Sequence, residues 1–131
     1  MKMYEYMGKD LFAKYGIPVP RGRVAKSPEE ASQITGEIGD VVIKSQILSG
    51  KRGKAGGIKF TKDPQEAENF ARDLLGSELR GLTVETILVE EKLKIDKEYY
   101  LSITIDRGMK CPVVLASTQG GMDIEEVPEE Y

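Results

Sequence analysis

The sequence predicts an α+β fold with a largely antiparallel sheet and flanking helices. Apolar residues recur at helical spacing in some segments of the 131-residue chain and form short β-branched runs in others. The predicted order is helix, strand, helix, two strands, helix and three strands. Strands that follow one another without a helix between them favour antiparallel pairing. The length suits one domain of ordinary size or two small lobes.

The first helix is predicted from an apolar stripe and ends where Gly16 and Pro18 stop it. Residues 27–30 (SPEE) form a capping box with proline at the first helical position, so they begin a second helix. The β-branched run 41–47 predicts a buried strand, and residues 58–61 predict the next one. The stripe of the first helix consists of Tyr4, Met7, Leu11, Phe12 and Tyr15.

The second half repeats these signals. Residues 63–66 (DPQE) resemble the first capping box and begin a third helix, which Gly76 closes. Residues 83–91 predict a strand. Residues 98–106 and 111–117 predict a hairpin around Arg107, Gly108 and Met109.

The composition excludes several kinds of site. The chain has no histidine, which removes the commonest general base and most zinc sites. Its single cysteine excludes an intrachain disulfide. There is no apolar run of the roughly 18 residues that a membrane span needs, so we expect a cytoplasmic protein without a membrane partner.

The most informative segment for function is basic and rich in glycine. Residues 41–62 carry six Lys and Arg side chains and no acid, in a chain of net charge -3. Within it, the loop 49–57 (SGKRGKAGG) allows backbone amides and cations to converge on an anion. The loop lacks the Walker A spacing. It predicts a flap over phosphates, and the alternative is a solvated basic turn.

Three charged residues around this loop are further candidates. Lys44 lies inside an apolar strand, on the face opposite Ile43, and is either a cation for phosphates or a lysine on a half-exposed strand. Glu90 and Glu98 bracket one connection between strands. They would hydrogen-bond an amino group and a ribose hydroxyl, or simply solvate the strand ends. The segment 117–121 (STQGG) is interpreted as a turn.

These motifs together resemble the β subunit of succinyl-CoA synthetase (succinate–CoA ligase), an ATP-grasp enzyme. The resemblance begins with YEY and KDLFAKYGIPVP near the N-terminus and continues through VIKSQ and RGKAGG. It resumes with LVE, KEYY and AST, and ends with GG and IE at residues 120–125, so it spans nearly the whole chain. The RGKAGG loop after a strand lysine is its most specific part.

The resemblance implies a nucleotide site. Lys44 would contact the phosphates, the segment Lys51, Arg52 and Gly53 would cover them, and Glu90 and Glu98 would face the adenine and ribose. It also implies ATP or GTP with Mg²⁺ whose ligands lie outside this chain, so we expect neither a catalytic residue nor a metal ligand here. The partner would be an α subunit that carries a phosphohistidine and the coenzyme A site.

By the same resemblance, residues 1–20 would pack with the second ATP-grasp lobe, 21–97 would form the small lobe, and 98–131 would start the second lobe. The acidic segment after Gly121 suggests a solvated linker, and we expect the isolated chain to be inactive. Departures from the family pattern at Leu48, Lys51 and Gln119 leave malate–CoA ligase or another ATP-grasp acyl-CoA ligase as alternatives. A nucleic-acid-binding module using residues 41–62 is a rival of a different class, although that segment holds only one aromatic residue, Phe60.

Overall fold

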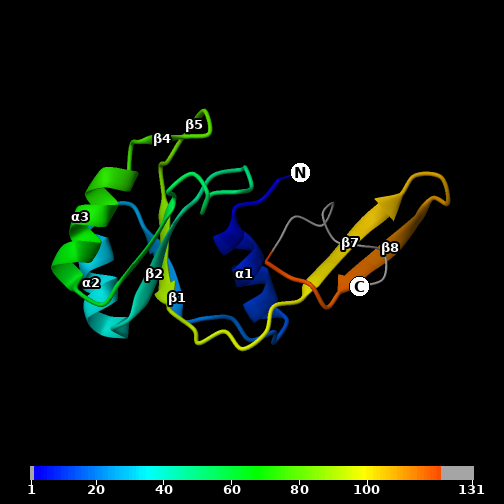
Figure 1. Cartoon of the computed structure of the whole chain (residues 1–131), viewed down its shortest axis with the longest axis horizontal. Coiled ribbons are helices and arrows are strands. Elements are labelled where there is room, and N and C mark those ends of the chain that lie inside the picture. Colours follow the sequence, from blue (N-terminus) through cyan, green and yellow to red (C-terminus); the bar gives the residue numbers. More distant parts are fainter. Residues whose placement is uncertain (1, 122–131) are drawn as a thin grey trace. The chain divides into compact units, whose positions relative to one another are not determined.

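The computed structural model describes residues 2–121 and divides into two compact units, Met1–Leu93 and Lys94–Tyr131. The first unit contains the three helices and strands β1 to β6, and the second contains a β-hairpin (Figure 1). The segment 122–131, with the acidic tail and the end of the family pattern, lies outside the described residues. The elements are α1 (Glu5–Lys14), β1 (Gly22–Ala25), α2 (Pro28–Ile38), β2 (Val41–Ser45), β3 (Ile58–Thr61), α3 (Pro64–Leu74), β4 (Glu78–Leu79), β5 (Leu82–Thr83), β6 (Ile87–Glu91), β7 (Tyr100–Asp106) and β8 (Cys111–Ser117).

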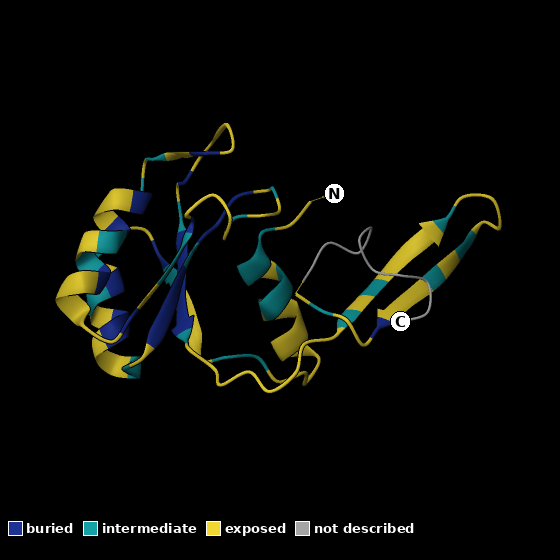
Figure 2. Ribbon diagram, in the orientation of Figure 1, coloured by how far each residue is buried: buried dark blue, intermediate teal, exposed yellow. Residues whose placement is uncertain are grey.

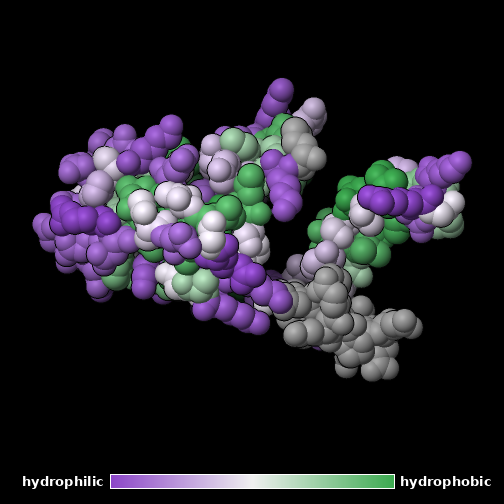
Figure 3. Space-filling view, turned by 90° about the horizontal axis from the view of Figure 1, so that it is seen from above, coloured by the Kyte–Doolittle hydropathy of each residue, from purple (hydrophilic) through white to green (hydrophobic). Residues whose placement is uncertain are grey.

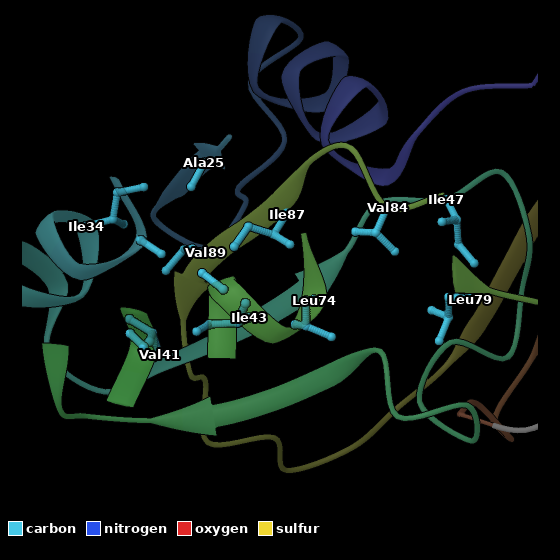
Figure 4. Packing of buried hydrophobic residues seen from close by; sticks show 13 residues of the cluster. Ala25, Ile34, Val41, Ile43, Ile47, Leu74, Leu79, Val84, Ile87 and Val89 are labelled. Carbon is cyan, nitrogen blue, oxygen red and sulfur yellow. The ribbon is translucent and has the colours of Figure 1, made fainter. Parts of the chain in front are cut away.

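A four-stranded antiparallel sheet of order β1-β6-β2-β3 organises the first unit. Helices α2 and α3 cover one face of this sheet, and α1 lies on the opposite face (Figure 1). The core forms between the sheet and α2 with α3, where the side chains of Ile34, Ile43, Leu74 and Val89 converge (Figure 4). The predicted α+β class with a largely antiparallel sheet is confirmed.

Strand alternation separates an apolar face from a charged one. On β2 and β6, the residues of the core cluster are Val41, Ile43, Ile87 and Val89, which point toward α2 and α3. Because successive side chains point to opposite faces, the residues between them point toward α1. These are Val42 and Lys44 on β2 and Leu88 and Glu90 on β6. The predicted orientation of Lys44, opposite Ile43, is therefore confirmed.

Both predicted helix starts form with an N-cap hydrogen bond, but the reciprocal bond of a capping box does not, because the Glu30 carboxylate accepts from the Lys26 amide and the Glu66 carboxylate bonds the Thr61 hydroxyl. The Ser27 hydroxyl accepts a hydrogen bond from the Glu30 amide at 3.2 Å, and the Asp63 carboxylate accepts one from the Gln65 amide at 2.9 Å. Helix α3 ends as predicted, with Leu75 as C-cap and Gly76 at φ 79°. The predicted strand 83–91 is interrupted, because the Val84 amide bonds to the Ser77 carbonyl and only β6 joins the sheet.

The apolar stripe of α1 is not buried in this unit. No residue of the helix is buried, and the exposed fractions are 53% for Phe12 and 77% for Tyr15 (Figure 2). Gly16 ends the helix as predicted, at φ 76°, with its amide bonded to the Ala13 carbonyl at 3.0 Å. The helix itself is confirmed, but its apolar side chains do not hold it on the sheet.

The second unit is a two-stranded hairpin with one apolar face. The register pairs Leu101 with Ala116, Ile103 with Val114 and Ile105 with Pro112, which places all six residues on one face. This apolar surface is exposed, with 73% for Ile103, and is visible as a hydrophobic area in Figure 3. Within the described residues, no further layer covers this face. A two-stranded hairpin without such packing is only marginally stable in water.

The core of the first unit predicts how its stability responds to truncation. Ile43→Ala should lower the free energy of unfolding by about 2–5 kcal/mol, since it leaves a cavity in a fully buried site. Ile17→Ala is the matched control, because Ile17 is 50% exposed and should cost about 0.5 kcal/mol or less. Urea denaturation followed by circular dichroism measures both. Equal losses in the two variants would contradict this assignment of the core.

Candidate functional site

The glycine-rich loop between β2 and β3 forms a series of tight turns. The amides of Ala55 and Gly57 bond back to the Arg52 carbonyl at 3.2 and 2.9 Å. Gly57 lies in close packing, because a Cβ there would lie 2.5 Å from the Leu79 Cδ2 atom and 3.2 Å from the Arg52 carbonyl oxygen, so a larger residue would force the Leu79 side chain to shift. Lys51 adopts φ 61°, in the left-handed region that favours glycine. That conformation gives a physical reason why glycine suits this position.

A cavity of about 810 Å³ lies beside this loop. This volume is within the range of about 300–1,000 Å³ typical of ligand sites. Its wall carries cations from the loop and one carboxylate, Glu5, from α1. The lining residues are Lys2, Met3, Glu5, Ile47, Leu48, Ser49, Gly50, Lys51, Arg52, Gly53 and Ile58.

Glu90 is the buried acid of the charged sheet face, with an exposed fraction of only 2%. A buried carboxylate is costly unless cations neutralise it. Two lysines do so: Lys44 Nζ lies 2.6 Å from one oxygen, and Lys9 Nζ lies 2.5 Å from the other. Gly22 pairs with Glu90 across β1 and β6, and a Cβ there would lie 2.5 Å from the Glu90 Cβ. The sequence thus leaves space for this pair by placing glycine opposite the acid.

Glu5, in the first turn of α1, extends this cluster to the loop. Its Oε1 lies 3.0 Å from Lys44 Nζ and 3.1 Å from Lys9 Nζ, and its Oε2 lies 2.6 Å from an Arg52 nitrogen. Arg52 also donates to the Ser45 carbonyl at 2.8 Å, which fixes its guanidinium against the end of β2. Together Glu5, Lys9, Lys44, Arg52 and Glu90 form what we call the charged cluster, with three cations and two carboxylates.

The charges of the cluster keep one another ionised. Burial raises the pKa of the Glu5 carboxyl, but the hydrogen bond from Arg52 and the charges of Lys44 and Lys9 outweigh it and lower the pKa to about 2. Burial lowers the pKa of Lys44, but its contacts with Glu90 and Glu5 raise it further than burial lowers it. Both shifts favour the ionised forms of Glu5 and Lys44 at neutral pH.

The structure brings most of the predicted site residues together. Lys44, Arg52 and Glu90 belong to one ion-pair network, and Lys51, Arg52 and Gly53 line the same cavity. Glu98 belongs to the second compact unit. Their roles in binding a nucleotide remain predictions.

The sequence analysis missed two members of the cluster, Glu5 and Lys9. Both lie within the motifs used for the family resemblance, but neither was singled out as a site residue. The available signal was their spacing, because an acid and a base four residues apart lie on the same side of a helix. What the spacing does not indicate is that this side of α1 faces Lys44 and Glu90, which are 39 and 81 residues away from their helix partners.

In the second unit, the close approach of Gly120 and Gly121 to the 98–99 segment explains the glycine pair. A Cβ on Gly120 would lie 2.6 Å from the Tyr99 amide nitrogen, and one on Gly121 would lie 2.5 Å from a Glu98 carboxylate oxygen. Gly121 also has φ 72°. These glycines make more than a simple turn, since they let the chain pack directly on Glu98.

Two kinds of feature are absent from residues 2–121. Within that range, no group of three or more His, Cys, Asp and Glu side chains is placed to hold a metal ion. Over the same residues, no helix is long and apolar enough to cross a membrane.

Comparison with known proteins identifies the family. Residues 2–131 match the family described as "ATP-grasp domain", and the chain belongs to this family. It is 54% identical over 128 residues to the succinate–CoA ligase [ADP-forming] subunit beta of Methanothermobacter thermautotrophicus. It is 50% identical over 131 residues to the succinate–CoA ligase [GDP-forming] subunit beta of Thermus thermophilus. The expected resemblance is confirmed. The alignments cover 97% and 99% of this chain but 35% of each relative, so the chain spans about a third of their length.

Solved structures share the fold. The chain superposes with a TM-score of 0.68 and 28% identity on the dinucleotide forming acetyl-coenzyme A synthetase 1 of Ca. Korarchaeum cryptofilum, in complex with coenzyme A, Ca-AMPCP and HgCl+. That match covers 88% of this chain and 53% of the other. ATP citrate lyase from Methanothrix soehngenii gives a TM-score of 0.73 at 22% identity over 93% of this chain and 33% of the other, which shows the fold alone.

The charged cluster predicts a pH dependence. The Glu5 pKa is lowered from 4.5 to about 2, so its stabilising contribution is complete above about pH 4.5 and is lost as the pH falls toward 2. A carbon-detected NMR titration of the Glu5 carboxyl measures this pKa directly. Arg52→Gln should raise it toward 4.5, because Arg52 is the largest lowering contribution. A Glu5 pKa near 4.5 in the unchanged chain would contradict the cluster.

Proposed function

We propose that this chain is the N-terminal, nucleotide-binding part of a succinate–CoA ligase β subunit. Lys44 and Arg52 would bind the nucleotide phosphates, and the loop segment from Lys51 to Gly53 would cover them. The observation that carries the proposal is the charged cluster beside the cavity of about 810 Å³. Cations fixed by buried partners next to a glycine-rich loop suit phosphate recognition.

The residues present fit a nucleotide. The charged ends of Lys44 and Arg52 are already held in place, Lys44 by Glu90 and Arg52 by the Ser45 carbonyl, so little side-chain freedom is lost when an anion binds. Glu90 and Glu98 would contact the adenine and ribose side of the nucleotide. The nucleotide, when bound, supplies the phosphoryl group, and this chain positions it and neutralises its charge.

The remaining assignments extend to the whole protein. ATP or GTP would be the nucleotide, with Mg²⁺ held by residues beyond this chain, and the partner would be an α subunit carrying phosphohistidine and coenzyme A. The complete enzyme would convert succinate, coenzyme A and nucleotide to succinyl-CoA, the nucleoside diphosphate and phosphate. The names of the relatives, ADP-forming and GDP-forming ligase subunits, support this reading. Cytoplasmic residence stays a prediction from the composition.

The domain division also stays a proposal. Two apolar surfaces are exposed: the stripe of α1 and one face of the β7–β8 hairpin. A further lobe would cover them. Residues 1–20 would therefore pack with the second ATP-grasp lobe, residues 21–97 would form the small lobe, and residues 98–131 would start the second lobe. Malate–CoA ligase and other ATP-grasp acyl-CoA ligases are less favoured, because the similar curated relatives cited above are all succinate–CoA ligase subunits.

Lysine substitutions test the nucleotide site. Lys44→Ala should weaken ATP binding by tenfold or more, about the value of one charge-assisted contact of 1.5–3 kcal/mol. Lys62→Ala is the matched control, since it removes the same charge from the same basic segment at an exposed position. Isothermal titration calorimetry measures both, and equal affinity for ATP in the Lys44→Ala variant and the unchanged chain would contradict the assignment.

The same two variants distinguish the nucleic-acid rival. A single-stranded oligonucleotide titrated at increasing salt should bind weakly if the segment serves a nucleotide site. Strong binding that falls steeply with salt, and that both lysine substitutions weaken alike, would favour a nucleic-acid-binding module instead.

A further inference from the structure

Helix α1 is held on the sheet by charge. None of its residues is buried, and its polar contacts with β2, β6 and the loop come from Glu5, Tyr6 and Lys9. Tyr6 donates its amide to the Gln46 side chain at 3.2 Å, which satisfies one of the donors that a helix leaves unpaired at its N-terminus. The first turn has no side-chain cap of its own at Tyr4. The ion pairs of Glu5 and the hydrogen bond of Tyr6 therefore hold this turn in place.

The Glu5 carboxylate lies where an anion would bind. One of its oxygens contacts Lys44 at 3.0 Å and the other contacts Arg52 at 2.6 Å, so a single anion bridges the two cations across β2 and the loop. Two oxygens of a phosphate group would make the same pair of contacts. Glu5 also lines the cavity beside the loop, in company with Arg52 and Lys51.

We propose that Glu5 is an internal competitor of the nucleotide. Its carboxylate occupies the phosphate position on Lys44 and Arg52, and a bound phosphate displaces it and opens the first turn of α1. The inference rests on the proposed function, because it takes Lys44 and Arg52 as phosphate ligands. It goes further by assigning a regulatory role to an acid of α1.

The exchange is favourable on physical grounds. A terminal phosphate carries more negative charge than a carboxylate and offers three acceptor oxygens, so it satisfies the two cations better. Leaving Glu5 in place beside the phosphate would put like charges within a few ångströms of one another. Lys9 stays paired with Glu90 at 2.5 Å, so the second turn of α1 remains attached while the first turn moves.

Affinity measurements test the competition. Inorganic tripolyphosphate and ATP are titrated by calorimetry into the unchanged chain and into Glu5→Gln and Glu37→Gln. Glu5→Gln should bind both ligands about tenfold tighter or more, because it removes the competing charge. Glu37→Gln should match the unchanged chain, since it removes the same charge from an exposed pair with Arg23 on the other side of the unit. Circular dichroism verifies that each variant is folded.

A second variant and a second measurement guard against a local folding defect. Glu5→Asp keeps the charge but is one methylene too short to reach both cations. Its affinity for tripolyphosphate and ATP should therefore lie between those of the unchanged chain and Glu5→Gln. Amide exchange by NMR should show the Tyr6, Met7 and Gly8 amides exchanging faster when tripolyphosphate is added to the unchanged chain. Slower exchange there, or Glu5→Gln binding no tighter than the unchanged chain, overturns the inference.

The outcomes separate this inference from the proposed function. Lys44→Ala could weaken ATP binding while Glu5→Gln binds ATP no tighter than the unchanged chain does. In that case only the competitor role fails. Glu5→Gln could bind tripolyphosphate tighter than the unchanged chain does, with ATP binding no tighter than tripolyphosphate. In that case the competitor role stands and the nucleotide assignment loses support. If neither ligand binds the unchanged chain or Glu5→Gln, both are wrong.

Discussion

The structure of the first unit depends on neutralising one buried carboxylate, Glu90. An unpaired acid at 2% exposure in the middle of a sheet would be strongly destabilising. Lys44 reaches it along the sheet, and Lys9 reaches it from α1. The first pairing fixes a cation on the face of β2 toward α1, and the second joins β6 to a helix none of whose own residues is buried. The neutralisation of Glu90 therefore links α1 to the sheet.

The two faces of the sheet serve different purposes. The face toward α2 and α3 is apolar and supplies the packing that stabilises the unit. The opposite face combines the buried side chains of Val42 and Leu88 with the ion pairs of Lys44 and Glu90. Because period-two alternation assigns neighbouring residues to opposite faces, a five-residue strand such as β2 contributes to both. Within this strand, the core residues and the proposed ligand-binding residue therefore point to opposite faces.

The two acids of the cluster differ in a way that matters for the proposed phosphate exchange. Three basic side chains surround them, and one of the acids, Glu5, is on a helix without a buried residue. Glu90 is enclosed by the sheet, whereas Glu5 is on an element with no buried residue. An incoming anion would therefore replace Glu5 more readily than Glu90. This difference in burial distinguishes the acid that organises the site from the acid that competes for it.

Local chemistry made much of the fold predictable from the sequence. N-caps at Ser27 and Asp63 begin helices, glycines follow their ends, and alternation along residues 41–45 places Lys44 on the face away from the core. The basic loop was recognisable because its charges and glycines are contiguous. Only the tertiary structure decided which of these residues lie in contact with one another. Glu5 and Lys9 meet Lys44 and Glu90 across 39 and 81 residues of sequence, because sheet pairing and helix docking, which no local pattern encodes, bring them together.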